Sequence, residues 1–306
     1  MSPSAQRLLD ACAFPLAGVA VSLAVSGGPD SLGLLLLALE AQLVVTVHHV
    51  DHHARATSSD DAEFVRAFCR ELGVPCVVHD VVVEPGGNFE ARARAERQRV
   101  LPAGSLTGHT MDDLAETVLL NMVRGAGIDG LSPMVNDATK PLRALRRHGL
   151  HEYLDESNVK ALHDESNDDL SFRRNRVRHQ LLPLMCEVAE RDVVPLLARQ
   201  ADVLYEERAW LDLLSDTDAP LALGDADCRE LRAWPRARLR RWLRAKLFVA
   251  DEMNDTHPPS AAEVERAMDV VLGDVVATQL SGARRLARRG QRLTLEGDST
   301  TLTNNG

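Results

Sequence analysis

Short apolar runs alternate with amphipathic stretches along the first part of the chain. Four apolar runs have the length of buried strands and cover residues 19–25, 43–50, 74–83 and 105–109. The stretches that follow them have helical spacing and cover residues 31–41, 58–73, 88–101 and 110–127. Strands that alternate with helices predict an α/β fold with a doubly wound parallel sheet, whose ligand binds at the carboxyl ends of the strands.

The pattern changes in the second half of the chain. No strand pattern is apparent beyond about residue 180, and residues 186–250 place apolar side chains at helical spacing. The last ten residues are polar. We therefore predict a sheet-containing domain over 1–190, a smaller and mainly helical domain over 191–296, and a flexible tail over 297–306.

The composition is that of a soluble globular protein, with 45% apolar and 26% charged residues in a chain of 306. No apolar run approaches the roughly 20 residues that cross a bilayer, and the N-terminus has no signal-peptide pattern. The five cysteines are widely spaced and include no CxxC pair, so neither a disulfide framework nor a CxxC metal site is indicated. These features predict a cytoplasmic protein that does not contact a membrane.

Arginine dominates the positive charge of the chain and is clustered. The formal net charge of −10 by itself argues against a nucleic-acid-binding protein. Only 3 of the 35 Lys and Arg residues are lysines, a bias that a GC-rich genome would also produce. Such a genome does not explain why basic residues gather at 173–179, 229–246 and 284–292. An acidic protein with three basic patches fits local binding of a polyanion.

The strongest chemical signal is a glycine-rich loop between the first strand and the first helix, formed by Ser26, Gly27, Gly28, Pro29, Asp30 and Ser31. The glycines allow a tight turn whose N–H groups converge on an anion at a helix N-terminus, which indicates a phosphate-binding loop. The GxxxxGKS/T pattern of a Walker A loop is absent. Because Asp30 would repel phosphate unless Mg²⁺ lies between them, we predict a metal ion at Asp30. The alternative is an ordinary Gly-Gly turn.

A second group of ionisable residues ends the second strand, with the sequence His48-His49-Val50-Asp51-His52-His53-Ala54-Arg55. The HxHxDH pattern of binuclear metallohydrolases would need a histidine where Val47 stands, so it is excluded. The Asp51-His52-His53 sequence matches the DHH signature of a phosphoesterase family, which remains an alternative. A solvated loop of histidines is a further alternative.

Acidic residues open the helix predicted at 110–127. Asp113 and Glu116 are three positions apart and therefore on one face, where they could hold a substrate ammonium or a cation. They also have a structural explanation, because Thr110 and Asp113 match a capping box and acids in a first turn favour the helix dipole. The sequence leaves both explanations open.

Arginines at helical spacing provide two further candidate sites. Arg94 and Arg97 lie three positions apart, where they either bind phosphates or belong to a solvated face. Another arginine-rich segment stands beside Phe172, which suits a folded RNA because phosphate contacts give affinity and stacking holds unpaired bases. The candidate RNA-binding residues are Arg173, Arg174, Asn175, Arg176 and Arg178.

Taken in order, these motifs resemble the N-type ATP pyrophosphatase (PP-loop) superfamily and, within it, the tRNA(Ile)-lysidine synthase family. SGGPDS is similar to the family's SGGxDS loop, and HVDHHAR is similar to its HxDHGLR. NFEARARAERQRVL resembles NLExxARxxRYxxL, and GHTMDDLAETVLLNMVRGAG resembles GHxxDDQxETxLxxLxRGxG. FRRNRVRHQLLP resembles FxRNxIRxxLLP. The loop alone also occurs in asparagine, GMP and NAD synthetases, but the ordered set over about residues 19–185 is specific.

The resemblance implies an ATP-dependent ligase that forms a C–N bond on a tRNA. Cytidine O2 of the wobble base in the CAU anticodon of tRNA(Ile) would attack the α-phosphate of ATP and release pyrophosphate. The ε-amine of free L-lysine would then attack C2 of the adenylated base and release AMP, which forms lysidine. Residues 1–190 would be the catalytic domain and residues 191–296 a tRNA-binding domain. The resemblance also leaves room for a homodimer.

The resemblance implies a role for each candidate residue. The loop from Ser26 to Ser31 would hold the β- and γ-phosphates of ATP, with Asp30 on Mg²⁺. Charge on the α-phosphate would be neutralised by Arg94, with Arg97 beside it. The ammonium groups of lysine would bind Asp113 and Glu116. His52 and Arg55 would lie near the nucleotide, and the arginine-rich segment from Arg173 to Arg178 would grip the anticodon loop.

Two other function classes make different demands on the sequence. A DHH-type phosphoesterase would need a DxD arrangement on the first strand, where only Asp30 is present. An RNA-binding relative without catalysis would be expected to lack Asp30, Asp113 or Glu116, and all three are present. The sequence therefore favours the ligase. Another PP-loop enzyme that modifies tRNA with a different donor is a further alternative.

Overall fold

The computed structural model describes residues 3–51, 58–81, 92, 96–97, 99–163, 167–217, 219–250 and 256–297. The chain divides into two compact units, Met1–Tyr205 and Glu206–Gly306. The division falls within the long helix α9 (Val194–Asp216), downstream of the boundary predicted near residue 190. Within these described ranges, no helix is long and apolar enough to span a membrane.

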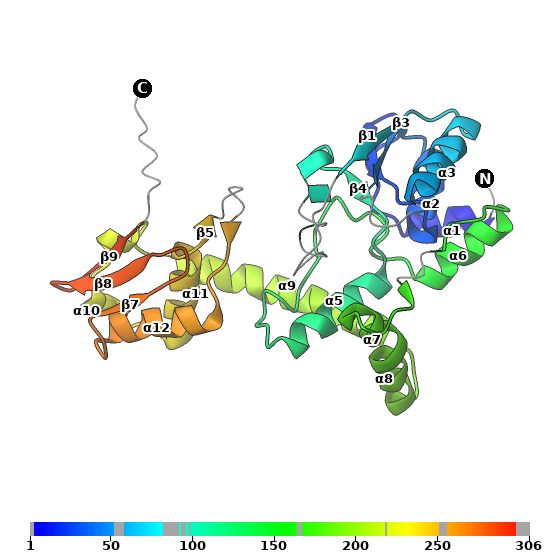
Figure 1. Ribbon diagram of the computed structural model, residues 1–306. Helices are drawn as coiled ribbons and strands as arrows, with labels where there is room; N and C mark the ends of the chain where they lie inside the picture. The colour runs from blue at the N-terminus through cyan, green and yellow to red at the C-terminus, as the bar shows by residue number, and fades with distance from the viewer. Residues whose placement is uncertain are drawn as a thin grey trace, which may run out of the picture. The chain divides into compact units, whose positions relative to one another are not determined.

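A four-stranded parallel sheet forms the centre of the first unit (Figure 1). Its strands are β1 (Ala20–Ala24), β2 (Val44–Asp51), β3 (Cys76–Asp80) and β4 (Leu106–Thr107), in the order β3-β2-β1-β4. This confirms the predicted doubly wound parallel sheet. Because the strand order reverses at β1, the carboxyl ends of β1 and β4 border the crevice in which such folds bind ligands.

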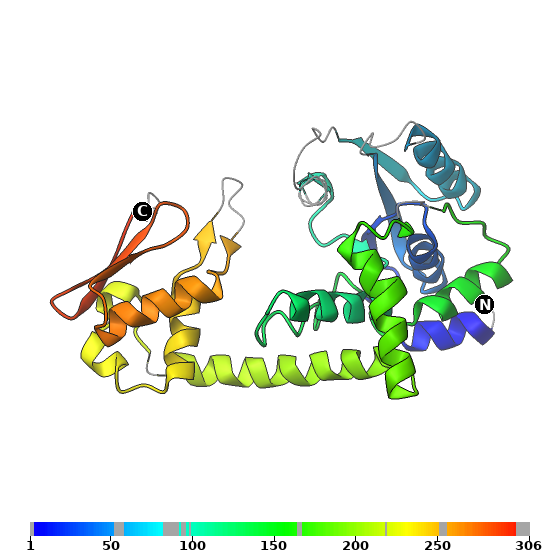
Figure 2. The same ribbon diagram turned by 60° about the horizontal axis from the view of Figure 1, so that its bottom comes forward.

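Apolar helices cover the sheet. Helix α2 (Pro29–Glu40) contacts β1 and β2, while α3 (Ser58–Glu71) contacts β2 and β3. Helices α1 (Pro3–Asp10) and α6 (Arg147–Glu156) pack against α2 and lie side by side (Figure 2). The leucines of α2 are buried on several faces because the helix has neighbours on both sides. This packing fixes both α2 and the N-terminal end of α6.

A second apolar cluster lies around α5 (Met111–Val123), which begins shortly after β4. Leu114, Val118 and Leu119 pack against apolar residues of the π-helical turn η2 (Val177–Leu181), of α8 (Leu182–Ala189) and of the first part of α9. Helix α5 also contacts the short helix α7 (Arg173–Arg176). Burial of this apolar face brings the arginine-rich segment alongside α5. The helix predicted at 88–101 falls largely outside the described residues.

The second unit combines helices with small antiparallel sheets. Its helices after α9 are α10 (Cys228–Leu231), α11 (Arg236–Lys246) and α12 (Ala261–Leu272), with a 3₁₀ turn at Leu223–Asp225. A two-stranded sheet pairs β5 (Val249–Ala250) with β6 (Thr256–His257). A three-stranded sheet contains β7 (Ala277–Gln279), β8 (Arg285–Arg289) and β9 (Arg292–Glu296). The expectation that no strands follow residue 180 was therefore wrong, because arginines flank the few buried apolar residues of β8 and β9 and hide their pattern.

Candidate functional site

The glycine-rich loop joins β1 to the N-terminus of α2. Gly27 has a φ of +91°, and a Cβ atom there would come within 2.6 Å of Leu162 Cδ1, so the turn requires glycine. The Ser31 hydroxyl donates to the Gly28 carbonyl at 2.8 Å and accepts the Ser26 N–H at 3.2 Å, which closes the loop on itself. Helix α2 begins at Pro29, so the positive end of its dipole lies at this loop.

A cavity of about 630 Å³ opens at the carboxyl ends of β1, β2 and β4. The glycine-rich loop forms one wall, and Gly108 and His109, which follow β4, form another. A Cβ atom on Gly108 would lie 2.5 Å from the Asp30 backbone oxygen, so the two walls touch through glycine. Ionisable side chains from other elements complete the lining, including Arg97, Asp113, Arg147, His151 and Arg178.

The two carboxylate oxygens of Asp113 have different partners. Oδ2 accepts hydrogen bonds from the N–H and the hydroxyl of Thr110, each at 2.8 Å, at the start of α5. Oδ1 accepts a hydrogen bond from Arg147 and another from Arg174, each at 2.9 Å. The capping role that the sequence offered is therefore confirmed. The other carboxylate oxygen pairs with arginines of the chain itself, and its binding of a substrate ammonium stays a prediction.

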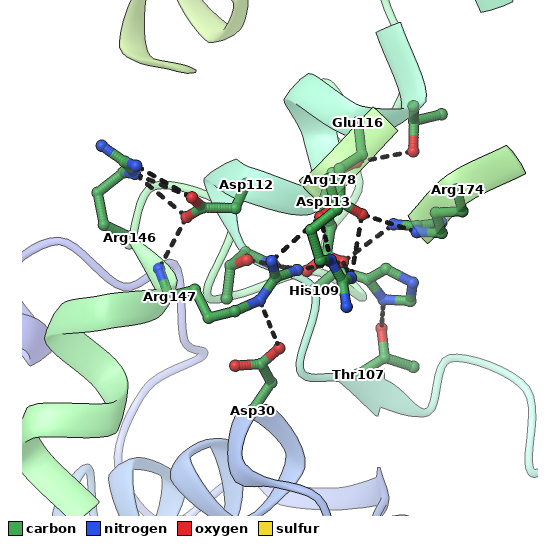
Figure 3. A network of polar contacts seen from close by, with 12 residues as sticks. Asp30, Thr107, His109, Asp112, Asp113, Glu116, Arg146, Arg147, Arg174 and Arg178 are labelled. Carbon is green, nitrogen blue, oxygen red and sulfur yellow. Dashed lines mark hydrogen bonds and ion pairs between the residues drawn. The ribbon is translucent and has the colours of Figure 1, made fainter. Parts of the chain in front are cut away.

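Glu116 is fully buried and surrounded by arginines (Figure 3). Its Oε1 accepts from Arg178 Nε at 2.7 Å and from Arg147 Nη1 at 3.1 Å. Its Oε2 accepts from Arg174 Nε at 2.8 Å and from Arg178 Nη2 at 3.1 Å. A carboxylate without solvent contact needs such pairing, because an unpaired buried charge costs several kcal/mol.

Arg147 binds three carboxylates at once. Its Nε donates to Asp30 at 3.2 Å, its Nη1 to Glu116 and its Nη2 to Asp113. Asp112 fixes this side chain at the start of α6, because it accepts the Arg147 backbone N–H at 2.8 Å and pairs with the Arg146 guanidinium at 3.0 Å. Arg147 was not predicted from the sequence, because two consecutive arginines at the start of a helix are typical of a solvent-exposed turn.

The electrostatics of the cluster favour the charged forms of Asp113 and Arg147. Burial raises the pKa of Asp113, but Arg147 and Arg174 outweigh it and hold that pKa at about 2. Burial lowers the pKa of Arg147, but Asp113, Glu116 and Asp30 raise it further above its usual value. Three carboxylates thus face three guanidinium groups, those of Arg147, Arg174 and Arg178. The formal charges of these six side chains cancel, so a further cation binds here only if a guanidinium moves away or an anion enters with it.

A neutral histidine lies beside the cluster. His109 Nδ1 is 2.7 Å from the Thr107 hydroxyl, which also accepts a hydrogen bond from Lys140 Nζ at 2.8 Å. Burial, together with the charge of Lys140, lowers the pKa of His109 to about 4. The imidazole is therefore uncharged near neutral pH and faces the cavity as a hydrogen-bonding group. The sequence motifs included this residue without a role for it.

The structure separates the predicted RNA-binding residues into three groups. Arg174 and Arg178 turn inward to Asp113 and Glu116. Asn175 is buried, and its amide donates to the Asp169 carbonyl at 2.9 Å, which supports the start of α7. The remaining two, Arg173 and Arg176, are exposed. Their contact with an anticodon loop stays a prediction.

Three other predicted site residues, His52, Arg55 and Arg94, lie outside the described residues. Arg97, three positions after Arg94 in the sequence, lines the cavity. The contribution of this pair to an α-phosphate site stays a prediction.

Many arginines of the second unit bind partners within that unit. Glu265 pairs with Arg240 and with Arg236, the latter at 3.3 Å. Glu296 pairs with Arg285 at 3.0 Å and also with Arg289. The buried Arg284 donates to the carbonyls of Leu247 and Phe248 at 3.0 and 2.9 Å. These clusters therefore stabilise the unit itself, and their contact with tRNA stays a prediction.

Asp30 suits a magnesium ion that is shared with a nucleotide. Its carboxylate lines the cavity, where Arg147 and His151 hold it at 3.2 and 3.1 Å. Among the residues that the structure describes, no group of three or more His, Cys, Asp or Glu side chains could hold a metal by itself. Mg²⁺ often binds one or two carboxylates together with substrate phosphates, so one carboxylate fits this mode.

Comparisons with known proteins identify the family of the chain. The PP-loop domain family matches residues 1–185. A tRNA(Ile)-lysidine synthase of Mycolicibacterium paratuberculosis is 39% identical over 213 residues, which are 66% of each chain. A tRNA(Ile)-lysidine synthase of Mycobacterium leprae is 34% identical over 282 residues, which are 87% of each chain. The match thus spans slightly less than two thirds of the first relative and most of the second.

A solved structure supports the fold alone. The U34-tRNA thiolase NcsA from Methanococcus maripaludis, determined with its 4Fe–4S cluster, is 15% identical to this chain with a TM-score of 0.52. The similarity covers 66% of this chain and 78% of that one. It supports the PP-loop architecture of the first unit and carries no argument about substrate.

Proposed function

Because the chain belongs to the PP-loop family and, within it, to the tRNA(Ile)-lysidine synthases, we propose that it uses ATP to join L-lysine to C2 of the wobble cytidine of tRNA(Ile). The observation that carries this proposal is the position of Asp113 and Glu116. These two carboxylates lie beside Asp30 of the glycine-rich loop and are linked to it through Arg147. A phosphate-binding loop and a pair of cation-binding carboxylates in one site suit a reaction between a nucleotide and an amine.

The first step activates the base. The loop from Ser26 to Ser31 and the N-terminus of α2 bind the β- and γ-phosphates of ATP, with Asp30 as a ligand of Mg²⁺. The bound ion would supply positive charge to the phosphates. Arg97, with Arg94, offsets charge at the α-phosphate while cytidine O2 attacks it and pyrophosphate leaves. The O2 atom of the base is then bonded to the adenylyl phosphorus, so AMP, which includes this oxygen, is a good leaving group at C2.

The second step requires a rearrangement of the arginines. A lysine ammonium can bind Asp113 and Glu116 only if a guanidinium releases them, because the three carboxylates are already balanced by three arginines. Arg147 is best placed to move, since its Nε already reaches the loop residue Asp30. A bound triphosphate offers this guanidinium new anionic partners. We therefore propose that ATP binds before lysine and frees the lysine site.

The neutral imidazole of His109 lies at the same cavity. An uncharged ring can accept a hydrogen bond from the reacting amine, which has to be deprotonated before it attacks C2. The attack forms the C2–N bond, and AMP departs with the former O2 of the base.

The proposal also includes lysine as the donor, the CAU anticodon as the target, a homodimer and a cytoplasmic location.

Pyrophosphate release tests the proposal. ATP and Mg²⁺ are supplied with tRNA(Ile) carrying a CAU anticodon and with lysine, and each component is omitted in turn. We expect release that depends on the tRNA, and we expect Asp30→Asn to reduce it strongly. Pyrophosphate release that does not depend on the tRNA would contradict the proposal. A lack of release, together with phosphodiester cleavage in Mn²⁺, would favour the DHH-type phosphoesterase instead.

A further inference from the structure

A second cavity lies in the first unit and shares no lining residue with the site described above. It has a volume of about 430 Å³ and is formed by the end of α5 and by α7, η2 and α8. Its apolar walls come from Leu120, Val123, Val177, Leu181 and Leu184. Val123 is 75% exposed and Leu184 is 53% exposed, so the walls are open to solvent.

One helical segment separates this apolar pocket from the carboxylate cluster. Arg174 and Arg178, four positions apart, point from α7 and η2 to Glu116. Residues 173, 176, 177, 180 and 181 of the same segment line the pocket on another face. Because an α-helix with its side chains is about 10–12 Å across, a ligand can reach both sites only if it passes around this segment.

The rim of the pocket is positively charged. Arg124, Arg173 and Arg176 line it, and among the described residues no carboxylate pairs with any of the three. By contrast, Arg174 and Arg178 on the same segment are neutralised by Asp113 and Glu116. No acidic residue is among the lining residues, and the amide of Gln180 is the polar group that accompanies the arginines.

We infer that this pocket receives one unpaired base of the tRNA anticodon loop, other than the wobble cytidine that enters the catalytic cavity. The apolar walls would cover the faces of the base, and Gln180 can bond its edge. The three arginines would bind the phosphates on either side of it. The inference rests on the proposed function, because it takes the RNA substrate from there.

Charge favours RNA over a protein partner at this pocket. An apolar groove that binds a protein helix needs mainly apolar partners. Three guanidinium groups that have no carboxylate partner in the described part of the chain instead suit a ligand with one flat apolar part and several anionic parts. A nucleotide has both parts. The pocket would then hold the anticodon loop in one position while the wobble cytidine reaches the carboxylate site.

The test combines a protein variant with single-base deletions in the RNA. Val123→Glu places a carboxylate in the pocket at an exposed position, and Val188→Glu on α8 is the matched control, since Val188 is 78% exposed and does not line the pocket. Each full-length variant is titrated with tRNA(Ile) transcripts in which one nucleotide of the anticodon loop at a time is abasic. The dissociation constants are compared with those of intact tRNA.

We expect one abasic position outside the wobble site to weaken binding to the natural chain by about 5- to 100-fold. Val123→Glu should weaken binding of intact tRNA to a similar extent. Its affinity for that abasic RNA should be no lower than its affinity for intact tRNA. Val188→Glu should bind both RNAs as the natural chain does. Equal binding of intact tRNA by both variants would overturn the inference. So would a result in which the losses from Val123→Glu and from the missing base add at every abasic position, which means that the pocket and the base are not coupled. A change in sedimentation of Val123→Glu without a change in RNA affinity would also overturn it, and would assign the pocket to contacts between copies of the chain.

Lysine transfer by the natural chain, measured on the same preparation, separates this inference from the proposed function. Coupling between the pocket and one base without any lysine transfer would contradict the proposed function and support the pocket. Lysine transfer without such coupling would contradict the pocket alone.

Discussion

Arg147 Nε donates a hydrogen bond to Asp30 at 3.2 Å, and this contact joins the phosphate-binding loop to the carboxylates of α5. The other two nitrogens of the same guanidinium bind Asp113 and Glu116. The proposed lysine site is therefore occupied by a cation of the chain itself, which, in our proposal, a bound nucleotide draws away.

Replacement of Arg147 by methionine should expose the lysine site. Without the guanidinium, Asp113 and Glu116 face one positive charge fewer, so we expect free lysine to bind about tenfold more tightly in the absence of nucleotide. In the natural chain, lysine should bind measurably only when a non-hydrolysable ATP analogue is present. Calorimetric titration checks both statements, with Arg199→Met, at an exposed position on α9, as the control. Equal lysine affinity with and without the analogue in the natural chain would contradict the proposed order of binding.

Loss of the Glu116 charge should destabilise the first unit. Glu116→Gln leaves three half-buried arginines with two carboxylates, and removal of one partner from a buried ion pair costs about 3–5 kcal/mol. The free energy of unfolding in urea measures this, with Glu187→Gln on the exposed side of α8 as the control. We also expect lysine transfer to fall more than pyrophosphate release, because Glu116 serves the second step. An equal fall in both would assign Glu116 to the fold or to the first step.

A methyl group at Gly108 should separate the two walls of the catalytic cavity. The added Cβ would lie 2.5 Å from the Asp30 backbone oxygen, so the loop has to shift. For Gly108→Ala we expect a stability loss of about 1–3 kcal/mol and a roughly tenfold weaker affinity for ATP. Gly224→Ala is the control, because a Cβ there meets nothing within 4 Å. Unchanged ATP binding in Gly108→Ala would show that this contact does not position the loop.

The depressed pKa of His109 should appear in the pH dependence of stability. Between pH 6.5 and about 4, the unfolded chain binds a proton at this residue that the folded chain does not bind. Stability therefore falls as the pH is lowered through this window, by up to about 3 kcal/mol from this residue. We expect His109→Asn to reduce that part of the fall, as measured by urea unfolding at several pH values. His148→Asn, at an exposed position, controls for the loss of a histidine, and identical pH profiles for all three proteins would contradict the assignment.

The sequence predicted the parts of the site that depend on local spacing. The loop from Ser26 to Ser31 could be identified because a strand precedes it and a helix follows it. The positions of Asp113 and Glu116 on one helical face followed from their separation by three residues. The sheet was predicted because its strands are short apolar runs. This pattern is visible in the sequence without knowledge of which helices pack on the sheet.

Features that depend on tertiary packing were not predictable. Arg147 reaches the site because α6 packs against α2 and Asp112 holds the first turn of α6, and neither contact leaves a local pattern. The inward turn of Arg174 and Arg178 depends on burial of Val177 against α5. In the second unit, β8 was read as a basic patch because its arginines outnumber its buried apolar residues.

Transfer of labelled lysine to tRNA tests the central claim most directly. The natural chain is incubated with ATP, Mg²⁺, labelled lysine and tRNA(Ile) with a CAU anticodon, beside the same tRNA with the wobble cytidine replaced by uridine. We expect label in the first RNA only, in an amount equal to the AMP released, and none without ATP. Label in neither RNA, from a chain that is folded and binds the tRNA, would contradict the proposed ligation.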